Sequence, residues 1–323
     1  MNKPEAVQTG MALSYKYKFN AVLKQIVNNR YLLLLFLPGF IYFIIFKYGP
    51  MYGVSIAFKD FLPTEGIAGS PWVGLKHFEK MFTSMEFWMV FRNTLIISIY
   101  SIIFVFPVPI ILALMLNELR SMVFKRVTQT LIYLPYFISW VIGAGLIIEL
   151  LSPESGVINY IIKLFGGQPI YFITKAEYFR PILVITSIWK NAGWGTIIYM
   201  AALAGIDIEM YEAAVIDGAS RFQKMIYITI PSIVNIIIIM FILRIGFILN
   251  ADFEQILNLY NPLVLDVADI IDTYIYRVGL LGSISTYSYA AVVGLFKSII
   301  GLTLIIITNK LADRFTSGEM KVW

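Results

Sequence analysis

The chain has 323 residues, of which 59% are hydrophobic and only 14% are charged, and its formal net charge is +5. Soluble domains carry about 25% charged residues, so this composition excludes an ordinary globular protein and indicates a polytopic membrane protein. Cysteine is absent, which excludes thiolate metal sites, disulfides and thiol catalysis, and the single histidine, His77, excludes multi-histidine sites. We therefore expect no metal site. We also expect no nucleic-acid binding, because the excess positive charge suits the cytoplasmic segments of a bacterial inner-membrane protein.

Residues 1–30 are predicted to be a basic cytoplasmic segment, either a helix on the membrane surface or a solvated tail. No cleavable signal is expected, since these residues lack an apolar core. The first apolar run begins at Tyr31. Because a span needs about 20 residues, we predict that this helix extends past Lys47, with Gly49 and Pro50 bending its outer end.

Six membrane-spanning helices are predicted between residues 31 and 308, in an all-α membrane domain. The five later spans are residues 94–116, 127–148, 181–203, 230–249 and 287–308. External loops are predicted at 59–92, with short amphipathic helices over 75–92, and at 149–180 and 250–286; a cytoplasmic tail covers 309–323. Pro107 and Pro109 should kink the second span.

An even number of spans places both termini on one side of the membrane. The basic residues at the N-terminus, in the loop Arg120–Arg126 and in the tail put that side in the cytoplasm. The segment 207–231, between spans four and five, is therefore predicted to be cytoplasmic.

This segment has more local structure than a simple turn needs. Asp207 stands at a helix start, where an acidic group complements the helix dipole. Gly218 can adopt the left-handed conformation that ends a helix, and Ser220 with Gln223 forms a capping-box pattern for a second helix. The sequence predicts a helix, a sharp turn and another helix, presented to water as a docking surface.

Glu212-Ala213-Ala214, Gly218 and Ile228-Thr229-Ile230-Pro231 resemble the E-A-A-x3-G-x9-I-x-L-P signature of permease subunits of binding-protein-dependent ABC importers, with Ile230 in place of leucine. The flanks, Leu203–Asp207 and Met210–Ala219, resemble the carbohydrate branch of that family. Further stretches resemble its polysaccharide and oligosaccharide permeases: Phe46–Gly53, Gly69–Leu75, Tyr133–Trp140, Phe253–Leu257 with Tyr260–Pro262, and Asp266–Asp269 with Asp272–Tyr274. The resemblance covers the chain from about residue 30.

The resemblance implies a type I importer fold and a complex with a second homologous permease, two ATPase subunits and an extracytoplasmic solute-binding protein. A heterodimer of permeases is expected. In the family the E-A-A segment is the coupling helix, seated in a cleft of the ATPase. The alternative is a cytoplasmic turn that only covers lipid headgroups. The ATPase-coupling positions implied here are Met210, Glu212, Ala213, Ala214, Asp217, Gly218, Ile228 and Pro231.

The sequence favours no catalytic function. The nucleotide-binding pattern G-x-x-x-x-G-K-[ST] is absent, so ATP and Mg²⁺ are expected on the partner ATPase and no cofactor on this chain. Asp269 and Asp272 could act as paired carboxylates, but we interpret them as part of a solvated helix face.

Arg244 lies within the fifth predicted span, where an uncompensated charge is costly. It either donates hydrogen bonds to a sugar in the transport path or forms a structural pair with an acid such as Glu149 or Glu254. Lys297 in the sixth span presents the same choice, or belongs to a helix–helix interface. Tryptophan rings can stack on sugar faces, although most aromatic residues in spans serve packing. The substrate-pathway candidates are Arg244, Asn250, Glu254, Lys297, Trp189, Asn191 and Trp194.

We therefore expect a permease subunit of an ATP-driven importer of oligosaccharides derived from polysaccharide, which forms half of an alternating-access pathway. Arg244 and Lys297 make acidic cargo of alginate or pectin type attractive, although arginine also binds neutral hydroxyls. The region 254–260 is the expected contact for the binding protein. One alternative is an ABC permease for a different small solute. Another is an ion-coupled secondary transporter, for which no inverted repeat is visible.

Overall fold

The computed structural model describes residues 28–283 and 286–315. Most of the predicted basic segment and the end of the predicted tail lie outside the described residues. The regular elements of the described part are helical, apart from one isolated bridge between Lys59 and Trp72, so the predicted all-α fold is confirmed.

The chain divides into two units, residues 1–56 and 57–323. The first contains α2 (Arg30–Phe43), a π turn (Ile44–Tyr48) and α3 (Gly49–Met51). A short 3₁₀ segment, Tyr52–Phe58, follows, and the whole run of 29 residues is long and apolar enough to cross a membrane. The prediction that this span continues past Lys47 is confirmed.

Three helical runs of the second unit meet the same criterion of length and composition, namely Met85–Asn117, Arg221–Gly246 and Tyr287–Lys310. They are built from α6 (Met85–Tyr100) with α7 (Pro107–Asn117), α13 (Arg221–Lys224) with α14 (Ile230–Gly246), and α18 (Tyr287–Phe315). The helix α6 begins at Met85, so the predicted external helix over 75–92 is wrong in its second half. Only α5 (Lys76–Thr83) is separate.

The third predicted span, 127–148, is not one helix. It consists of α8 (Met122–Tyr133), the 3₁₀ turn η4 (Leu134–Phe137) and α9 (Trp140–Leu150), and it is bent by 103° at the break. Pro135 cannot supply a backbone N–H to continue α8. The Ser139 hydroxyl then starts α9 by accepting a hydrogen bond from the Ile142 N–H at 3.4 Å. Counted as one span, this bent pair brings the described spans to five.

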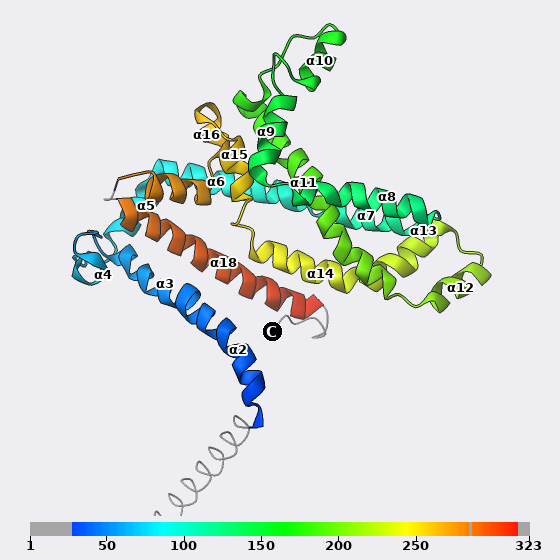
Figure 1. The fold of residues 1–323 in the computed structure, drawn as a ribbon, viewed down its shortest axis with the longest axis horizontal. Coiled ribbons are helices and arrows are strands. Elements are labelled where there is room, and N and C mark those ends of the chain that lie inside the picture. Colours follow the sequence, from blue (N-terminus) through cyan, green and yellow to red (C-terminus); the bar gives the residue numbers. More distant parts are fainter. Residues whose placement is uncertain (1–27, 284–285, 316–323) are drawn as a thin grey trace, which may run out of the picture. The chain divides into compact units, whose positions relative to one another are not determined.

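The fourth predicted span, 181–203, corresponds to α11 (Ala176–Ala204), a helix of 29 residues that begins earlier than predicted. It is not among the strongly apolar helices of the described part, because a polar stretch around Lys190 and Asn191 interrupts it. The helix packs against α7, α8 and α14, while α14 packs against α18 (Figure 1). The segment between α9 and α11 contains the short helix α10 (Val157–Leu164).

Three π turns stand in the same relation to a proline. The turns Ile44–Tyr48, Ser101–Val105 and Met225–Thr229 each end two residues before one, at Pro50, Pro107 and Pro231. Proline removes one helical hydrogen bond and crowds the carbonyl four residues earlier, and a wider turn accommodates both effects. The run Met85–Asn117 therefore remains one span around Pro107 instead of breaking there.

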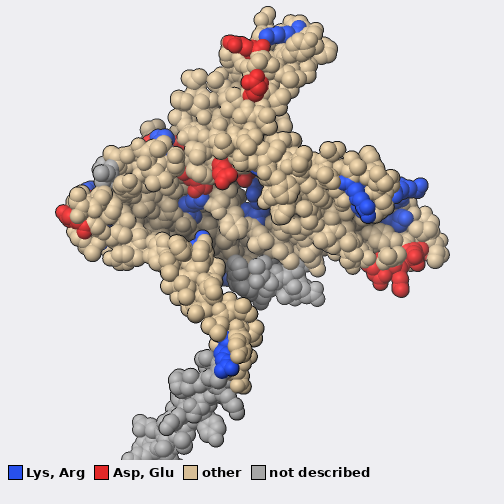
Figure 2. All heavy atoms as spheres, in the orientation of Figure 1, with Lys and Arg blue, Asp and Glu red and all other residues tan. Residues whose placement is uncertain are grey.

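Short elements close the two ends of the second unit. The segment 207–231, which we call the coupling segment after its predicted role, contains α12 (Ile208–Ile216) at one end, and α5 lies at the other (Figure 1). Acidic side chains gather at α12 and basic ones over the neighbouring α8 and α13, and a further group of both signs lies in the hollow at the middle of the molecule (Figure 2).

A continuous apolar core fixes α9, α11 and the segment after α14. Trp140 and Ile147 of α9 pack with Phe179 and Leu183 of α11. The helices α15 (Phe253–Leu259), α16 (Leu265–Ala268) and α17 (Ile271–Ile275) follow α14, and the first two complete this core.

Candidate functional site: a coupling segment and a central cavity

The local structure predicted for residues 207–231 is confirmed. The Asp207 carboxylate caps α12 by accepting a hydrogen bond from the Glu209 N–H at 3.0 Å. Gly218 has φ of +76°, the left-handed conformation that favours glycine. Ser220 and Gln223 exchange both bonds of a capping box, at 3.3 and 2.8 Å, and so open α13.

The helix α12 exposes an apolar surface. Its large exposed side chains are Ile208, Met210, Val215 and Ile216. Val215 and Ile216 form an open hollow with Tyr211 and Glu212. Of the other predicted coupling residues, Ala213, Asp217, Gly218 and Pro231 are exposed, and Ala214 and Ile228 are half-buried. Apolar side chains presented in this way are typical of a protein-binding surface.

A polar contact joins this segment to the start of the fifth predicted span. The Tyr211 hydroxyl lies 2.9 Å from the hydroxyl of Thr229, which is buried. Thr229 directly precedes α14, the helix that carries Arg244. A displacement of α12 would therefore act directly on α14.

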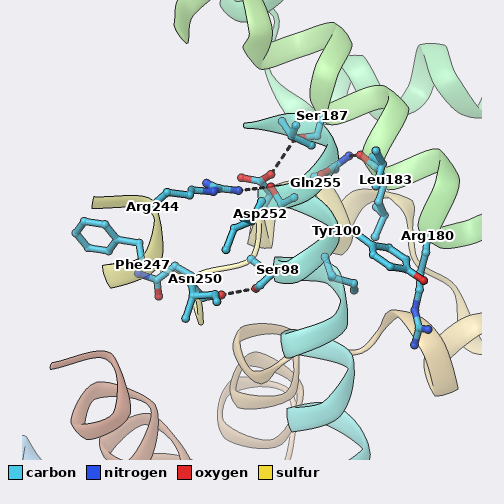
Figure 3. A pocket seen from close by; sticks show the side chains of 17 residues that line it. Ser98, Tyr100, Arg180, Leu183, Ser187, Arg244, Phe247, Asn250, Asp252 and Gln255 are labelled. Carbon is cyan, nitrogen blue, oxygen red and sulfur yellow. Dashed lines mark hydrogen bonds between the residues drawn. The ribbon is translucent and has the colours of Figure 1, made fainter. Parts of the chain in front are cut away.

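Arg244 lies in a partly open cavity lined by α6, the following π turn, α7, α11, α14 and the segment that leads to α15 (Figure 3). A wide chamber of about 390 Å³ adjoins a narrow extension of about 20 Å³, which has room for about one water molecule. The two parts share Val105, Ser187, Arg244, Phe247 and Asp252.

The Arg244 guanidinium donates a hydrogen bond to the Ser101 hydroxyl. It makes no ion pair with any carboxylate of the described chain. The structural pairs considered from the sequence do not form: Glu149 accepts a hydrogen bond from the Ser155 hydroxyl at 2.7 Å, and Glu254 does not line the cavity. Arg244 thus faces the cavity with part of its hydrogen-bonding capacity unused by protein groups.

A second guanidinium, that of Arg180, lines the narrow extension. Its Nε donates to the Val267 carbonyl oxygen at 3.3 Å, and its Nη2 donates to the Asn93 amide oxygen at 2.9 Å. Both partners are neutral. The cavity wall therefore carries two cations whose charge no described carboxylate neutralises by an ion pair.

Acceptors and neutral polar groups stand opposite these cations. The Asp252 carboxylate accepts a hydrogen bond from the Ser187 hydroxyl at 3.2 Å, and Asn191 donates to the same hydroxyl at 3.2 Å. Gln255 is held by the Leu183 carbonyl at 2.8 Å and by a threonine hydroxyl. Hydroxyl, amide, carboxylate and guanidinium groups in one cavity suit a ligand with many hydroxyls and some negative charge.

The structure brings together only part of the predicted substrate pathway. Arg244, Asn250 and Asn191 line the cavity, and Glu254 does not. Lys297 lines a separate hollow between α14 and α18. Neither predicted tryptophan lines the cavity: Trp189 lies over Gly143, and the Trp194 ring stacks on Tyr136 with centroids 4.6 Å apart.

Several cavity residues were missed from the sequence, chiefly Ser98, Ser101, Arg180, Ser187, Asp252 and Gln255. A usable signal exists for some of them. Ser187 and Asn191 are four residues apart, and Ser98 and Ser101 three apart, so each pair shares a helix face. Polar residues at helical spacing inside an apolar span indicate a wet face.

Asp269 and Asp272, interpreted above as a solvated face, are both ion-paired, so that interpretation is wrong. Asp269 is fully buried and binds Arg277 at 2.6 Å, and Arg277 also binds Glu86 at 2.9 Å. Asp272 binds Lys297 at 2.6 Å. We call these five residues the charge brace. Burial disfavours the charged form of Arg277, but its hydrogen bonds to Asp269 and Glu86 outweigh this and raise its pKa.

A second polar cluster orders the predicted first external loop. The Asp60 carboxylate binds Lys76 and His77, each at 2.7 Å. The hydrogen bond from Lys76 lowers the pKa of Asp60, and the one from His77 adds to this effect. His77 is thus a partner of a loop carboxylate, and the described residues contain no group of three or more metal-ligating side chains.

Comparison with known proteins shows a family match, a similar permease and two similar solved structures. A family profile described as binding-protein-dependent transport system inner membrane component matches residues 105–317. The polygalacturonan/rhamnogalacturonan transport system permease protein YteP of Bacillus subtilis (strain 168) is 46% identical over 308 residues, which cover 95% of each chain.

Two solved structures match closely. One is a bacterial ABC transporter involved in the import of the acidic polysaccharide alginate, with a TM-score of 0.86 and 41% identity over 92% of this chain and 99% of that chain. The other is a bacterial alginate ABC transporter in complex with an alginate pentasaccharide-bound periplasmic protein. Its TM-score is 0.85, with 40% identity over 93% of this chain and 99% of that chain.

Proposed function

Because the chain belongs to the family of binding-protein-dependent transport system inner membrane components, we propose that it is the permease subunit of an ATP-driven importer of acidic oligosaccharides. It is a multi-pass inner-membrane protein and a transport component, not an enzyme. The cargo is delivered by an extracytoplasmic binding protein and crosses the membrane through a path to which the central cavity contributes.

The observation that supports an acidic cargo is that Arg244 faces the cavity without an anionic partner among the described residues. Its guanidinium lines both parts of the cavity and binds a neutral serine hydroxyl, with no described carboxylate in an ion pair. A guanidinium can bind a carboxylate through two parallel hydrogen bonds, so the carboxylate of a uronate residue would use the free donors of Arg244 and neutralise its charge. The relatives support this reading, since one is named for polygalacturonan and rhamnogalacturonan and another imports alginate.

The partners in this proposal are a second permease, two ATPase subunits and the binding protein. The exposed apolar side chains of α12 support docking to an ATPase, and the Tyr211–Thr229 contact supports transfer of its movement to α14. Glu212 to Gly218 would contact the ATPase, and ATP with Mg²⁺ would bind there. The segment 254–260 remains our candidate contact for the binding protein.

Uptake into vesicles that contain the complete complex tests the cargo. In the variant Arg244→Gln, uptake of an oligogalacturonate should fall about tenfold, which corresponds to the loss of one charge-assisted hydrogen bond. Uptake of a neutral oligosaccharide of equal length should change little. The matched control is Lys163→Gln, which removes an exposed cation on α10 outside the cavity. Equal uptake of the acidic sugar by Arg244→Gln and the parent would refute acidic recognition at this site.

Co-purification tests the docking surface. Glu212→Lys should reduce recovery of the ATPase with the permease, whereas the exposed substitution Glu154→Lys on the segment before α10 should not. Normal recovery and normal uptake in the Glu212→Lys variant would exclude the coupling role.

A further inference from the structure

The helix α11 separates the cavity from the break between α8 and α9. One stripe of α11, with residues four apart, lines the wide chamber: Ser187, Asn191, Gly195 and Tyr199. Neighbouring residues of the same helix contact the broken span instead. Any cargo in the chamber therefore touches the helix that supports the break.

The contact between α11 and the break is unusually close. A Cβ atom at Gly193 would overlap the carbonyl oxygen of Ile132 on α8, so only glycine fits at this position without a shift of the backbone. One residue further, the Trp194 ring stacks on Tyr136 of η4 with an interplanar angle of 6°. The two helices thus meet through main chain and aromatic faces at the point where α8 ends.

Lys190 completes this contact. Its ammonium group donates hydrogen bonds to the carbonyl oxygens of Tyr136, at 2.9 Å, and of Ile138. It also lies 5.6 Å from the ring centroid of Tyr136 and 5.5 Å from that of Trp140. Lys190 is only 7% exposed and forms no ion pair with a described carboxylate.

The break explains why a lysine is needed. A helix that ends leaves carbonyl groups without a helical donor, and inside a membrane no bulk water can bind them. The ammonium group has three donors, and the aromatic faces of Tyr136 and Trp140 stabilise its charge. Lys190 therefore supplies, from a neighbouring helix, donors for two carbonyls of the break itself, those of Tyr136 in η4 and of Ile138 just after it.

We propose that Lys190 is a positioning residue that fixes the bend between α8 and α9 and couples it to the cavity face of α11. Asn191 lines the chamber and directly follows Lys190, so a cargo that displaces this face moves the ammonium group and the two carbonyls it holds. The bend stands on the geometry alone. Its part in transport rests on the proposed function.

The bend can be measured directly, since the chain has no native cysteine. Spin labels would be placed at Val123→Cys on α8 and Val141→Cys on α9, whose side chains are 74% and 69% exposed. The complete complex in lipid nanodiscs should give one narrow distance distribution. Lys190→Met should broaden it, and Lys190→Arg, which keeps donors for the carbonyls, should broaden it less.

The control is Lys163→Met, because Lys163 also donates to a carbonyl, that of Pro153 at 3.2 Å, but is exposed on α10. This control should keep the narrow distribution. A narrow distribution in Lys190→Met, or equal broadening in the control, would overturn the role of Lys190 at the bend. If Lys190→Met does not accumulate, Lys190→Gln, which keeps one amide donor, is judged by the same criteria.

ATPase activity of the same complexes tests the coupling. We expect the basal rate of Lys190→Met to stay near that of the parent, while stimulation by loaded binding protein falls about tenfold, as the loss of buried hydrogen bonds implies. A purely structural role would lower both rates together. Full stimulation in a variant with a broadened bend overturns the coupling. A parent complex that binding protein never stimulates would instead refute the proposed function and leave the bend to the distance measurement.

Discussion

The central cavity and the charge brace treat positive charge in opposite ways. In the brace, Arg277 and Lys297 bind the carboxylates of Glu86, Asp269 and Asp272. In the cavity, Arg244 and Arg180 bind a hydroxyl, an amide oxygen and a main-chain carbonyl, none of which carries a charge. Both regions lie in the same unit and are built from neighbouring helices.

The difference separates cations that hold the fold from cations that are available to a ligand. Removal of one partner of a buried ion pair strongly destabilises the protein, because the other charge stays buried without compensation. When a cation whose partners are all neutral is removed, no uncompensated charge stays behind in the protein. Substitutions in the brace should therefore lower stability, and substitutions in the cavity should alter transport with little effect on stability.

The largest effect is expected for Arg277→Ala. This change leaves Asp269 buried and unpaired, which should cost about 3 kcal/mol of unfolding free energy. Thermal unfolding of the purified protein in detergent measures it, with Arg244→Ala as the matched cavity variant. The comparison fails if the two alanine variants unfold at the same temperature.

A smaller loss, about 2 kcal/mol, is expected for Lys297→Met, because both partners of the Lys297–Asp272 pair retain some exposure. The exchanged pair, Lys297→Asp with Asp272→Lys, should recover part of the stability. If the exchange is no better than the single variant, the pair contributes by its packing and not by its charges.

The next prediction gives Arg244 in the cavity a carboxylate partner, like those that the cations of the charge brace have. In Ser101→Asp, the new carboxylate would pair with Arg244, which now binds the serine hydroxyl. Uptake of an acidic oligosaccharide should fall about tenfold, while the unfolding temperature stays the same or rises. Ser101→Asn, which adds similar bulk without charge, is the control. Unchanged uptake in the aspartate variant would show that Arg244 is not free for cargo.

The smallest effect concerns pH. The folded-state pKa of Asp60 lies below its ordinary value of 3.8, chiefly because of the hydrogen bond from Lys76. The stabilisation is therefore complete above that ordinary value and is lost as the pH falls through the lower, folded-state value. Trp72 stacks on Phe58 in the same loop, so its fluorescence should report the loosening. Asp60→Asn should remove this pH dependence.

The coupling segment could be predicted in detail because its structure is local. Asp207, Gly218, Ser220 and Gln223 determine caps and a turn within a few residues of themselves, and all four behave as the sequence indicates. The all-α class and most spans followed from apolar runs of sufficient length. Their ends were less certain, as α6 and α11 demonstrate by starting earlier than predicted.

The break and the pairings could not be predicted, since they depend on residues distant in the sequence. The run 127–148 carries no charged residue, and the carbonyls of Tyr136 and Ile138 at its break accept hydrogen bonds from Lys190, more than fifty positions away. Asp269 and Asp272 have the spacing of a solvated helix face, yet Glu86 and Lys297 approach from other helices to form the brace. Pattern alone cannot distinguish a charge facing water from one facing a buried partner.

The π turn before Pro231 sets the rotational phase of everything beyond it. It inserts one extra residue into the helix that leads from the coupling segment to Arg244. One residue corresponds to about 100° of rotation around a helix axis. If the same five residues, Met225–Thr229, formed a regular α-helical turn, the guanidinium of Arg244 would therefore be turned away from the chamber that it now lines.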